Sequence, residues 1–269
     1  SPALKYGIAV GALIFSFIIA IGTFSYELTK ADSDPRFTQA EVAFLLTQPE
    51  LLTQEANWES SVDQATLWIE NNLSVLVNFW FFGALLFLFR LLNSLSEIRG
   101  LRKSAQLVTD FEVQKMTYRL VCKLGISRDV ELRISAMAHS PLTFGTIKPV
   151  ILLPAALIFH LSPSQLEAII AHELAHVKRN DYLSNLLLSG LEILFFFHPC
   201  YWWMSHTVKE LRENAADDLA LKAGIQPKVL ATSLAEVLNF AKQNPPELAL
   251  AAGKKRNPTL LRIKRMLGY

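Results

Sequence analysis

Residues 171–176 have the sequence Ala-His-Glu-Leu-Ala-His, and the rest of the chain is best understood outward from them. In a helix, His172 and His176 lie four residues apart on one face, so both imidazoles can reach one metal ion. Glu173 sits at the rim of that face, where a carboxylate can accept a proton from water. This His-Glu-x-x-His arrangement predicts a zinc peptidase site; its alternative is two histidines that fall four apart by chance.

The segment around this motif has the signals of a buried helix. Ser162 is suited to be its N-cap, Pro163 its first residue and Gln165 the capping-box partner. Apolar residues then recur at helical spacing, namely Leu166, Ile169, Ile170, Leu174 and Val177.

A catalytic zinc ion also needs a third protein ligand and an open fourth position. The acidic stretch 210–218, Glu-Leu-Arg-Glu-Asn-Ala-Ala-Asp-Asp, offers this ligand on a second helix. Glu213 and Asp217 lie on one face of that helix because they are four residues apart.

The composition favours a membrane protein. Hydrophobic residues make up 51% of the 269 residues, which is high for a soluble enzyme, whereas the net charge of +2 indicates little. Cys122 and Cys200 are far apart in sequence and are interpreted as reduced packing residues in a cytoplasmic part. The sequence has no repeats, phosphate-binding loop or nucleic-acid motif, so no direct nucleic-acid binding is expected.

Two uncharged runs predict transmembrane helices. Residues 6–26 form the first, within a span assigned to 1–26, for which a signal peptide and a buried core helix are the alternatives. Residues 71–89 form the second, in a span assigned to 71–92 and followed by basic residues from Arg90 onward. The acidic segment 27–70 between them is predicted to be an extracytoplasmic loop with short amphipathic helices at 38–47 and 60–70.

The positive-inside rule then places everything after Arg90 in the cytoplasm. Residues 93–243 are predicted to form an α+β zinc domain, and the last 26 residues a linker and a basic amphipathic helix suited to anionic lipids, leading to a further membrane span. The expected elements are a polar helix at 90–124, strands at 130–134, 140–145 and 149–154, a membrane-surface helix from 182 ending at Pro199 or else a third span, and helices at 229–242 and 260–267. The prolines at both ends of the last strand favour an edge position.

Several short motifs of this chain resemble those of the BlaR/MecR-type antirepressor membrane metallopeptidases. They are Ser140-Pro141, Gly145, the run from Pro149 to Pro154, the run from Leu161 to Glu167, the motif from His172 to His176, Arg179-x-Asp181, His198-Pro199 and Glu213-x-x-x-Asp217-Asp218. The resemblance covers roughly residues 135–267. It implies a mainly α-helical bacterial inner-membrane protein, multi-pass, with a cytoplasmic gluzincin-type domain that contains a small sheet.

The resemblance also implies roles for single residues. His172, His176 and Glu213 would bind zinc, and Glu173 would be the general base. Asp217 and Asp181 are candidates to orient the ligand histidines, with surface charges as the alternative. His198 is a candidate to bind the oxyanion, although a lone histidine before proline is more often a packing or capping residue.

The expected function is a zinc endopeptidase that cleaves a cytoplasmic or membrane-proximal regulatory protein, such as a transcriptional repressor, with a homodimer left open. The alternative is a zinc-containing membrane receptor that binds a repressor without cutting it. Glu173 favours the enzyme, because a structural zinc site does not need a carboxylate there. Lys178 and Arg179, directly after the motif, argue against an intramembrane protease. The best-known family members detect β-lactams with an extracellular penicillin-binding sensor that has a Ser-x-x-Lys motif, and the sequence of this chain leaves its inducing signal open.

Overall fold

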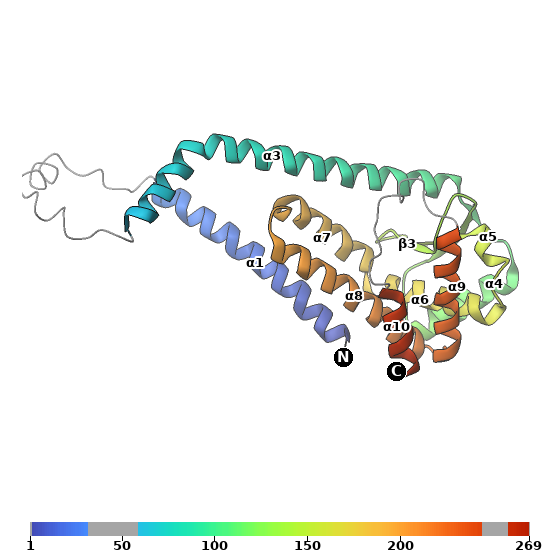
Figure 1. The fold of residues 1–269 in the computed structure, drawn as a ribbon. Helices are drawn as coiled ribbons and strands as arrows, with labels where there is room; N and C mark the ends of the chain where they lie inside the picture. The colour runs from blue at the N-terminus through green and yellow to red at the C-terminus, as the bar shows by residue number, and fades with distance from the viewer. Residues whose placement is uncertain (1, 32–58, 244–257, 269) are drawn as a thin grey trace, which may run out of the picture. The chain divides into compact units, whose positions relative to one another are not determined.

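A computed structural model describes residues 2–31, 59–243 and 258–268, so the expected helix at 38–47 lies outside the described residues. The helices, shown in Figure 1, are α1 (Pro2–Ala31), α3 (Glu59–Ser104), α4 (Phe111–Leu124), α5 (Ala155–Ile158), α6 (Pro163–Arg179), α7 (Asp181–Phe195), α8 (Pro199–Lys222), α9 (Pro227–Gln243) and α10 (Pro258–Leu267). The strands are β1 (Gln106–Leu107), β2 (Glu131–Ser135), β3 (Leu142–Phe144) and β4 (Val150–Pro154). The chain is mainly helical with a small mixed sheet, as the sequence predicts.

The chain divides into two compact units. One unit is Val10–Leu86, and the other combines Ser1–Ala9 with Phe87–Tyr269. Within the described residues, one helix is long and apolar enough to cross a membrane, the part of α3 from Gln64 to Ser104. Its large apolar side chains are exposed along most of its length, Phe79, Phe81 and Phe82 among them, which suits a lipid environment.

Helix α3 joins segments that the sequence predicts as separate. The expected amphipathic helix at 60–70, the apolar span and the start of the polar helix form one helix of 46 residues. The expected polar helix at 90–124 is divided instead, because strand β1 pairs with β2 between α3 and α4. Asp110 starts α4 anew, since its side chain accepts hydrogen bonds from the backbone N–H groups of Glu112 and Val113.

The sheet has the strand order β1-β2-β4-β3, with β2 and β4 parallel and the outer pairs antiparallel. Strand β4 therefore lies inside the sheet, and the edge position predicted for it is wrong. Its Ile151 and Leu153 pack with the core of α4, α6 and α9, whereas Val150 and Leu152 pack on the other face, against the end of α3. A strand buried on both faces has a continuous apolar run, and its prolines sit only at the two ends.

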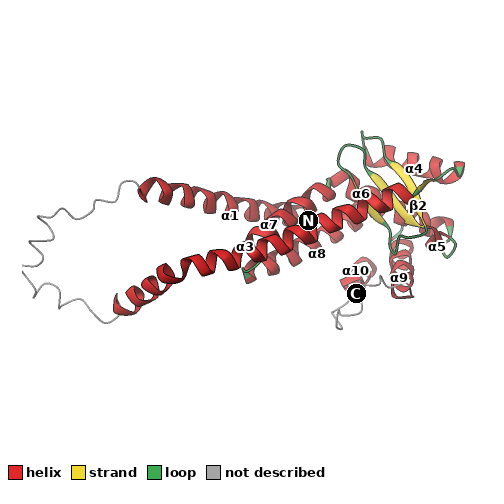
Figure 2. Ribbon diagram, turned by 90° about the horizontal axis from the view of Figure 1, so that it is seen from above, coloured by secondary structure: helices red, strands yellow, loops and turns green. Residues whose placement is uncertain are grey.

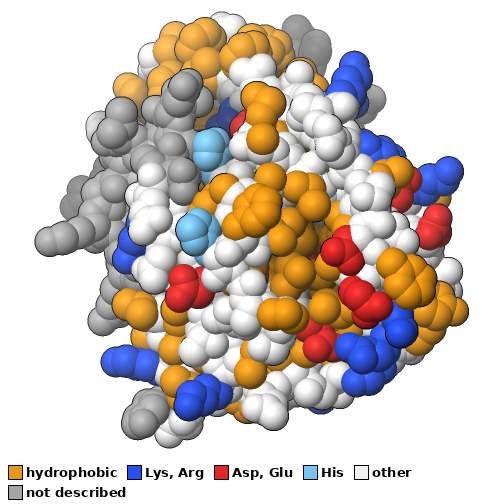
Figure 3. Space-filling view, turned by 90° about the vertical axis from the view of Figure 1, so that its right-hand side faces the viewer, with side chains coloured by type: hydrophobic (Ala, Val, Ile, Leu, Met, Phe, Trp, Pro, Cys, Tyr) orange, Lys and Arg blue, Asp and Glu red, His pale blue; other side chains and the backbone are white. Residues whose placement is uncertain are grey.

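Helix α6 connects the sheet with the remaining helices. It contacts β3 and β4 as well as α4, α8 and α9, and Figure 2 shows the strands beside it. Figure 3 shows the face of the molecule at the right of Figure 1, where hydrophobic side chains gather in the middle and charged side chains lie mainly to the right of them and below.

Two helix boundaries after α6 differ from the prediction. The expected helix from residue 182 ends at Phe195, and Pro199 begins α8 instead of ending α7. Proline fits the first turn of a helix because the N–H that it lacks has no partner there. Helix α7 is mostly half-buried, with Asp181 and Leu188 as its fully buried residues.

Candidate metal centre

Helix α6 presents the two histidines on one face. The predicted capping box is confirmed, since Ser162 accepts from the backbone N–H of Gln165 and the Gln165 side chain accepts from the Ser162 N–H. The Nε2 atoms of His172 and His176 lie 3.2 Å apart. Both imidazoles therefore direct this nitrogen to the same point.

Helix α8 brings Glu213 to that point. Glu213 Oε2 lies 3.6 Å from His172 Nε2 and 3.9 Å from His176 Nε2. Ligands held tetrahedrally about 2.0–2.2 Å from one zinc ion lie roughly 3.3–3.6 Å apart. Two imidazoles and one carboxylate are also the donor set of several catalytic zinc sites, so the residues present fit this metal.

The other ring nitrogen of each histidine faces a buried carboxylate. His176 Nδ1 lies 2.7 Å from Asp181 Oδ2, and His172 Nδ1 lies 3.1 Å from Asp217 Oδ1. The first contact is a hydrogen bond, whereas His172 Nδ1 has no aligned hydrogen bond and its contact is electrostatic. Both contacts favour a proton on Nδ1, which leaves Nε2 as the ligating atom.

A tight turn places Asp181 beside His176. Asn180 ends α6 with φ 56°, a left-handed conformation that asparagine adopts more readily than most residues. The next residue, Asp181, begins α7 and also accepts a hydrogen bond from Arg179 Nε at 3.2 Å.

Glu173 lies beside the three candidate ligands in an open cleft. Thr143 Oγ1, on β3, donates a hydrogen bond of 2.6 Å to Glu173 Oε2. The cleft has a volume of about 280 Å³, and its lining includes Ile98, Leu142, Thr143, Tyr182 and Arg212 besides the site residues. It is thus bounded by the edge strand β3 on one side and by α7 and α8 on the other.

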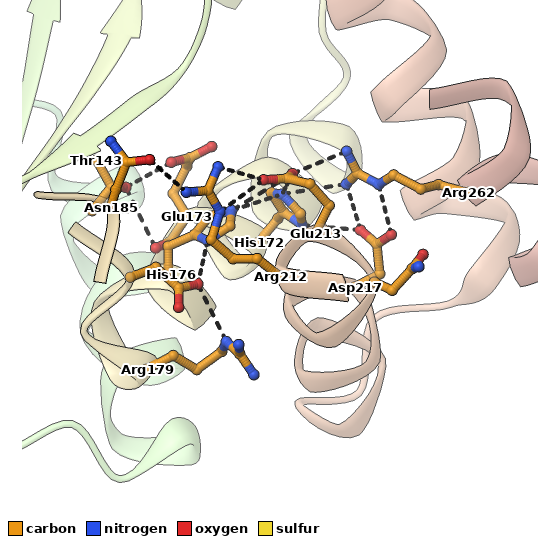
Figure 4. A network of polar contacts seen from close by, with 12 residues as sticks. Thr143, His172, Glu173, His176, Arg179, Asn185, Arg212, Glu213, Asp217 and Arg262 are labelled. Carbon is orange, nitrogen blue, oxygen red and sulfur yellow. Dashed lines mark hydrogen bonds and ion pairs between the residues drawn. The ribbon is translucent and has the colours of Figure 1, made fainter. Parts of the chain in front are cut away.

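The structure adds residues that sequence reasoning did not single out. Arg212 reaches Glu213 Oε1 at 3.3 Å and Asn185 Oδ1 at 3.1 Å, and Arg262 approaches Glu213 from α10 (Figure 4). Thr143 lies between Ser140-Pro141 and Gly145, and its place between these family motifs was the only sequence feature that pointed to a role for it. His198 does not join this group, because it is the exposed N-cap of α8 and lies outside the cleft lining.

The buried charges shift each other's ionisation. Burial alone would lower the pKa of His172, but the contacts with Asp217 and Glu213 raise it from 6.5 to about 9. Burial alone would raise the pKa of Glu213, but His172, His176 and Arg262 hold it well below its usual range. The carboxylate is therefore ionised at neutral pH, as a metal ligand must be.

This shift predicts how stability depends on pH once metal has been removed by a chelator. Because the pKa of His172 is raised on folding, its contribution is fully present below pH 6.5 and is lost as pH rises through about 9. The melting temperature of chelator-treated protein should fall across this interval, and that of His172→Gln should change less. If the melting temperatures of the two proteins fell equally over this pH interval, the raised pKa of His172 would not be the cause.

Comparison with known proteins gives the family. A sequence profile of the BlaR1 peptidase M56 family matches residues 8–252, which is most of the chain. The chain belongs to the BlaR1 peptidase M56 family. The resemblance stated from the motifs is thereby confirmed, and a metallopeptidase family implies a metal ion.

Two relatives and one solved structure are similar to this chain. Regulatory protein BlaR1 of Bacillus licheniformis is 28% identical over 259 residues, which cover 94% of this chain and 40% of that protein. The methicillin resistance mecR1 protein of Staphylococcus aureus is 28% identical over 147 residues, 53% of this chain and 24% of its own length. The chain thus spans less than half of these relatives. The structure of S. mikatae Ste24p has a TM-score of 0.47 and 16% identity, over 77% of this chain and 65% of that one.

Proposed function

We propose that this chain is a membrane-bound zinc endopeptidase that cleaves a cytoplasmic or membrane-proximal regulatory protein, with a transcriptional repressor as the candidate substrate. One observation carries the proposal: the donor atoms of His172, His176 and Glu213 lie within 4.8 Å of one another, and Glu173 shares their cleft. Membership of the M56 family and the regulatory and resistance proteins among the relatives support it.

The proposed reaction is hydrolysis of a peptide bond. His172, His176 and Glu213 would hold zinc, which when bound would polarise the scissile carbonyl and make water acidic. Glu173 would accept a proton from the attacking water and pass it to the leaving amine. Thr143 would hold the Glu173 carboxylate, since its hydroxyl donates to Oε2 at 2.6 Å. Asp181 and Asp217 would keep the two histidines oriented.

The substrate would bind as an extended strand along β3. Among the described residues this strand is at the edge of the sheet and pairs with β4 on one side only, and it lines the cleft with Leu142 and Thr143. An open edge offers backbone N–H and C=O groups to an incoming peptide. The cleft wall contains Ile98, Leu142 and Tyr182, so an apolar side chain next to the scissile bond is favoured.

Peptide profiling tests the proposed reaction. The purified chain in detergent would be incubated with a peptide library and the products identified by mass spectrometry. We expect cleavage beside apolar residues that a chelator abolishes and added zinc restores. A chain that holds zinc and leaves the whole library intact would support the receptor that binds a repressor without cutting it.

The proposed orientation places residues 27–70 outside the membrane and the metal centre in the cytoplasm. We expect Gln54→Cys to react with a membrane-impermeant maleimide in intact cells, and Lys103→Cys to react only after lysis. Cys122 and Cys200 are exposed, so their interpretation as packing residues is wrong, and both must first be replaced by serine. The orientation is wrong if the cysteine at position 103 reacts in intact cells and the one at 54 does not.

A further inference from the structure

Helix α10 inserts one arginine into the metal centre. The Arg262 guanidinium is largely buried and forms two hydrogen bonds with Asp217, from Nε to Oδ2 at 2.9 Å and from Nη2 to Oδ1 at 2.7 Å. Asp217 has no exposed surface, so its charge depends on partners within the protein. A paired, two-point contact of this kind fixes the plane of the carboxylate.

The same guanidinium also reaches two of the three candidate ligands. Its Nη1 donates to Glu213 Oε2 at 3.1 Å, and its Nη2 lies 3.4 Å from His172 Nε2. Figure 4 shows Arg262 on the opposite side of Glu213 from Thr143 and Asn185. Arg262 is therefore behind the metal centre and does not line the cleft that holds Glu173.

Two effects of Arg262 on a bound metal ion oppose each other. Its positive charge repels a cation, but it also holds Asp217, whose Oδ1 lies 3.1 Å from His172 Nδ1. The contacts with Asp217 are shorter than those with Glu213 and His172, so holding the carboxylate is its main role. Without Arg262, the buried Asp217 carboxylate would keep only the longer contact with Arg265 Nη2 at 3.9 Å and would be free to turn away from His172.

We propose that Arg262 is a positioning residue for the metal centre, which makes α10 a removable part of that centre. The inference rests on the proposed zinc site. Helix α10 is joined to the core by Ile263 and Met266, while Leu260, Leu261 and Leu267 are exposed. Displacement of α10 would withdraw Arg262 without unfolding α6 or α8, and the centre would then release its metal faster.

Zinc release into excess chelator tests this inference without relying on catalysis. The 269-residue chain in detergent would be loaded with zinc, and the release rate measured with a colorimetric chelator. Arg262→Ala should release zinc about 10- to 100-fold faster than the parent, the range typical of residues that orient metal ligands. Arg262→Lys keeps the charge and most of the volume but loses the two-point contact, so we expect an intermediate rate.

Two controls locate the effect. Arg265 lies on the same helix, donates to the Asn214 carbonyl and pairs with Asp218. It reaches Asp217 Oδ2 only at 3.9 Å, beyond hydrogen-bond distance, and it contacts none of the candidate ligands, so Arg265→Ala should release zinc at nearly the parent rate. If Arg262 acts through Asp217, the double variant with Asp217→Asn should be no faster than Asp217→Asn alone.

Three outcomes would overturn the inference: an unchanged rate in both Arg262 variants, slower release in Arg262→Ala, or additive effects in the double variant. Slower release would mean that the guanidinium competes with the metal. The proposed function fails separately, if the parent holds no zinc or if its zinc survives His172→Ala.

Discussion

Replacing Glu173 by alanine should abolish proteolysis and leave zinc bound. The carboxylate accepts a proton in the proposed reaction, and loss of a general base typically lowers the rate by about 10²–10⁴-fold. The side chain contacts Thr143 and lies beside the three candidate ligands, but it is not itself one of them. Zinc content by mass spectrometry and cleavage of a library peptide by chromatography, on the same preparation, measure the two effects.

The matched control is Glu173→Gln, which retains the size of the side chain and an oxygen that can accept from Thr143. It should be as inactive as Glu173→Ala, because an amide cannot act as the base at neutral pH. If a zinc-loaded Glu173→Ala protein still relieved repression in cells as fully as the parent, proteolysis would be excluded as the function. The non-cutting receptor would then replace the enzyme.

Replacing Glu213 by glutamine should remove most of the bound zinc. A neutral amide is a poorer ligand than a carboxylate, and the affinity should fall by more than about 100-fold. His172→Ala should have an effect of similar size. Equilibrium dialysis against a zinc buffer measures both.

Glu210 provides the control for Glu213, since it lies one turn earlier on α8. Its side chain is half-exposed and pairs with His206 at 3.8 Å, away from the candidate ligands. Glu210→Gln should therefore bind zinc like the parent. If Glu213→Gln keeps full zinc occupancy, the third ligand lies elsewhere.

The parts of this chain that were predictable depend on neighbours in sequence. The capping box of α6 and the face shared by His172 and His176 follow from spacings of three and four residues. The identity of the third metal ligand was less predictable, because spacing alone does not show which carboxylate of the acidic stretch faces the histidines. Only the family pattern favoured Glu213.

The features that sequence reasoning missed depend on long-range contacts. Strand β1 has two residues, too few to give a periodic pattern. The edge position of β4 was wrong because prolines at strand ends do not reveal what pairs on either side. Arg262 lies 45 residues after Asp217, and its helix has the pattern of an ordinary basic amphipathic helix. The sequence therefore does not indicate that this arginine contacts the site.

Zinc anomalous scattering from crystals of the zinc-loaded chain tests the central claim most directly. We expect one strong peak within about 2.0–2.2 Å of His172 Nε2, His176 Nε2 and a Glu213 oxygen. A peak at other residues, or no peak between α6 and α8 in a protein that carries stoichiometric zinc, would contradict it.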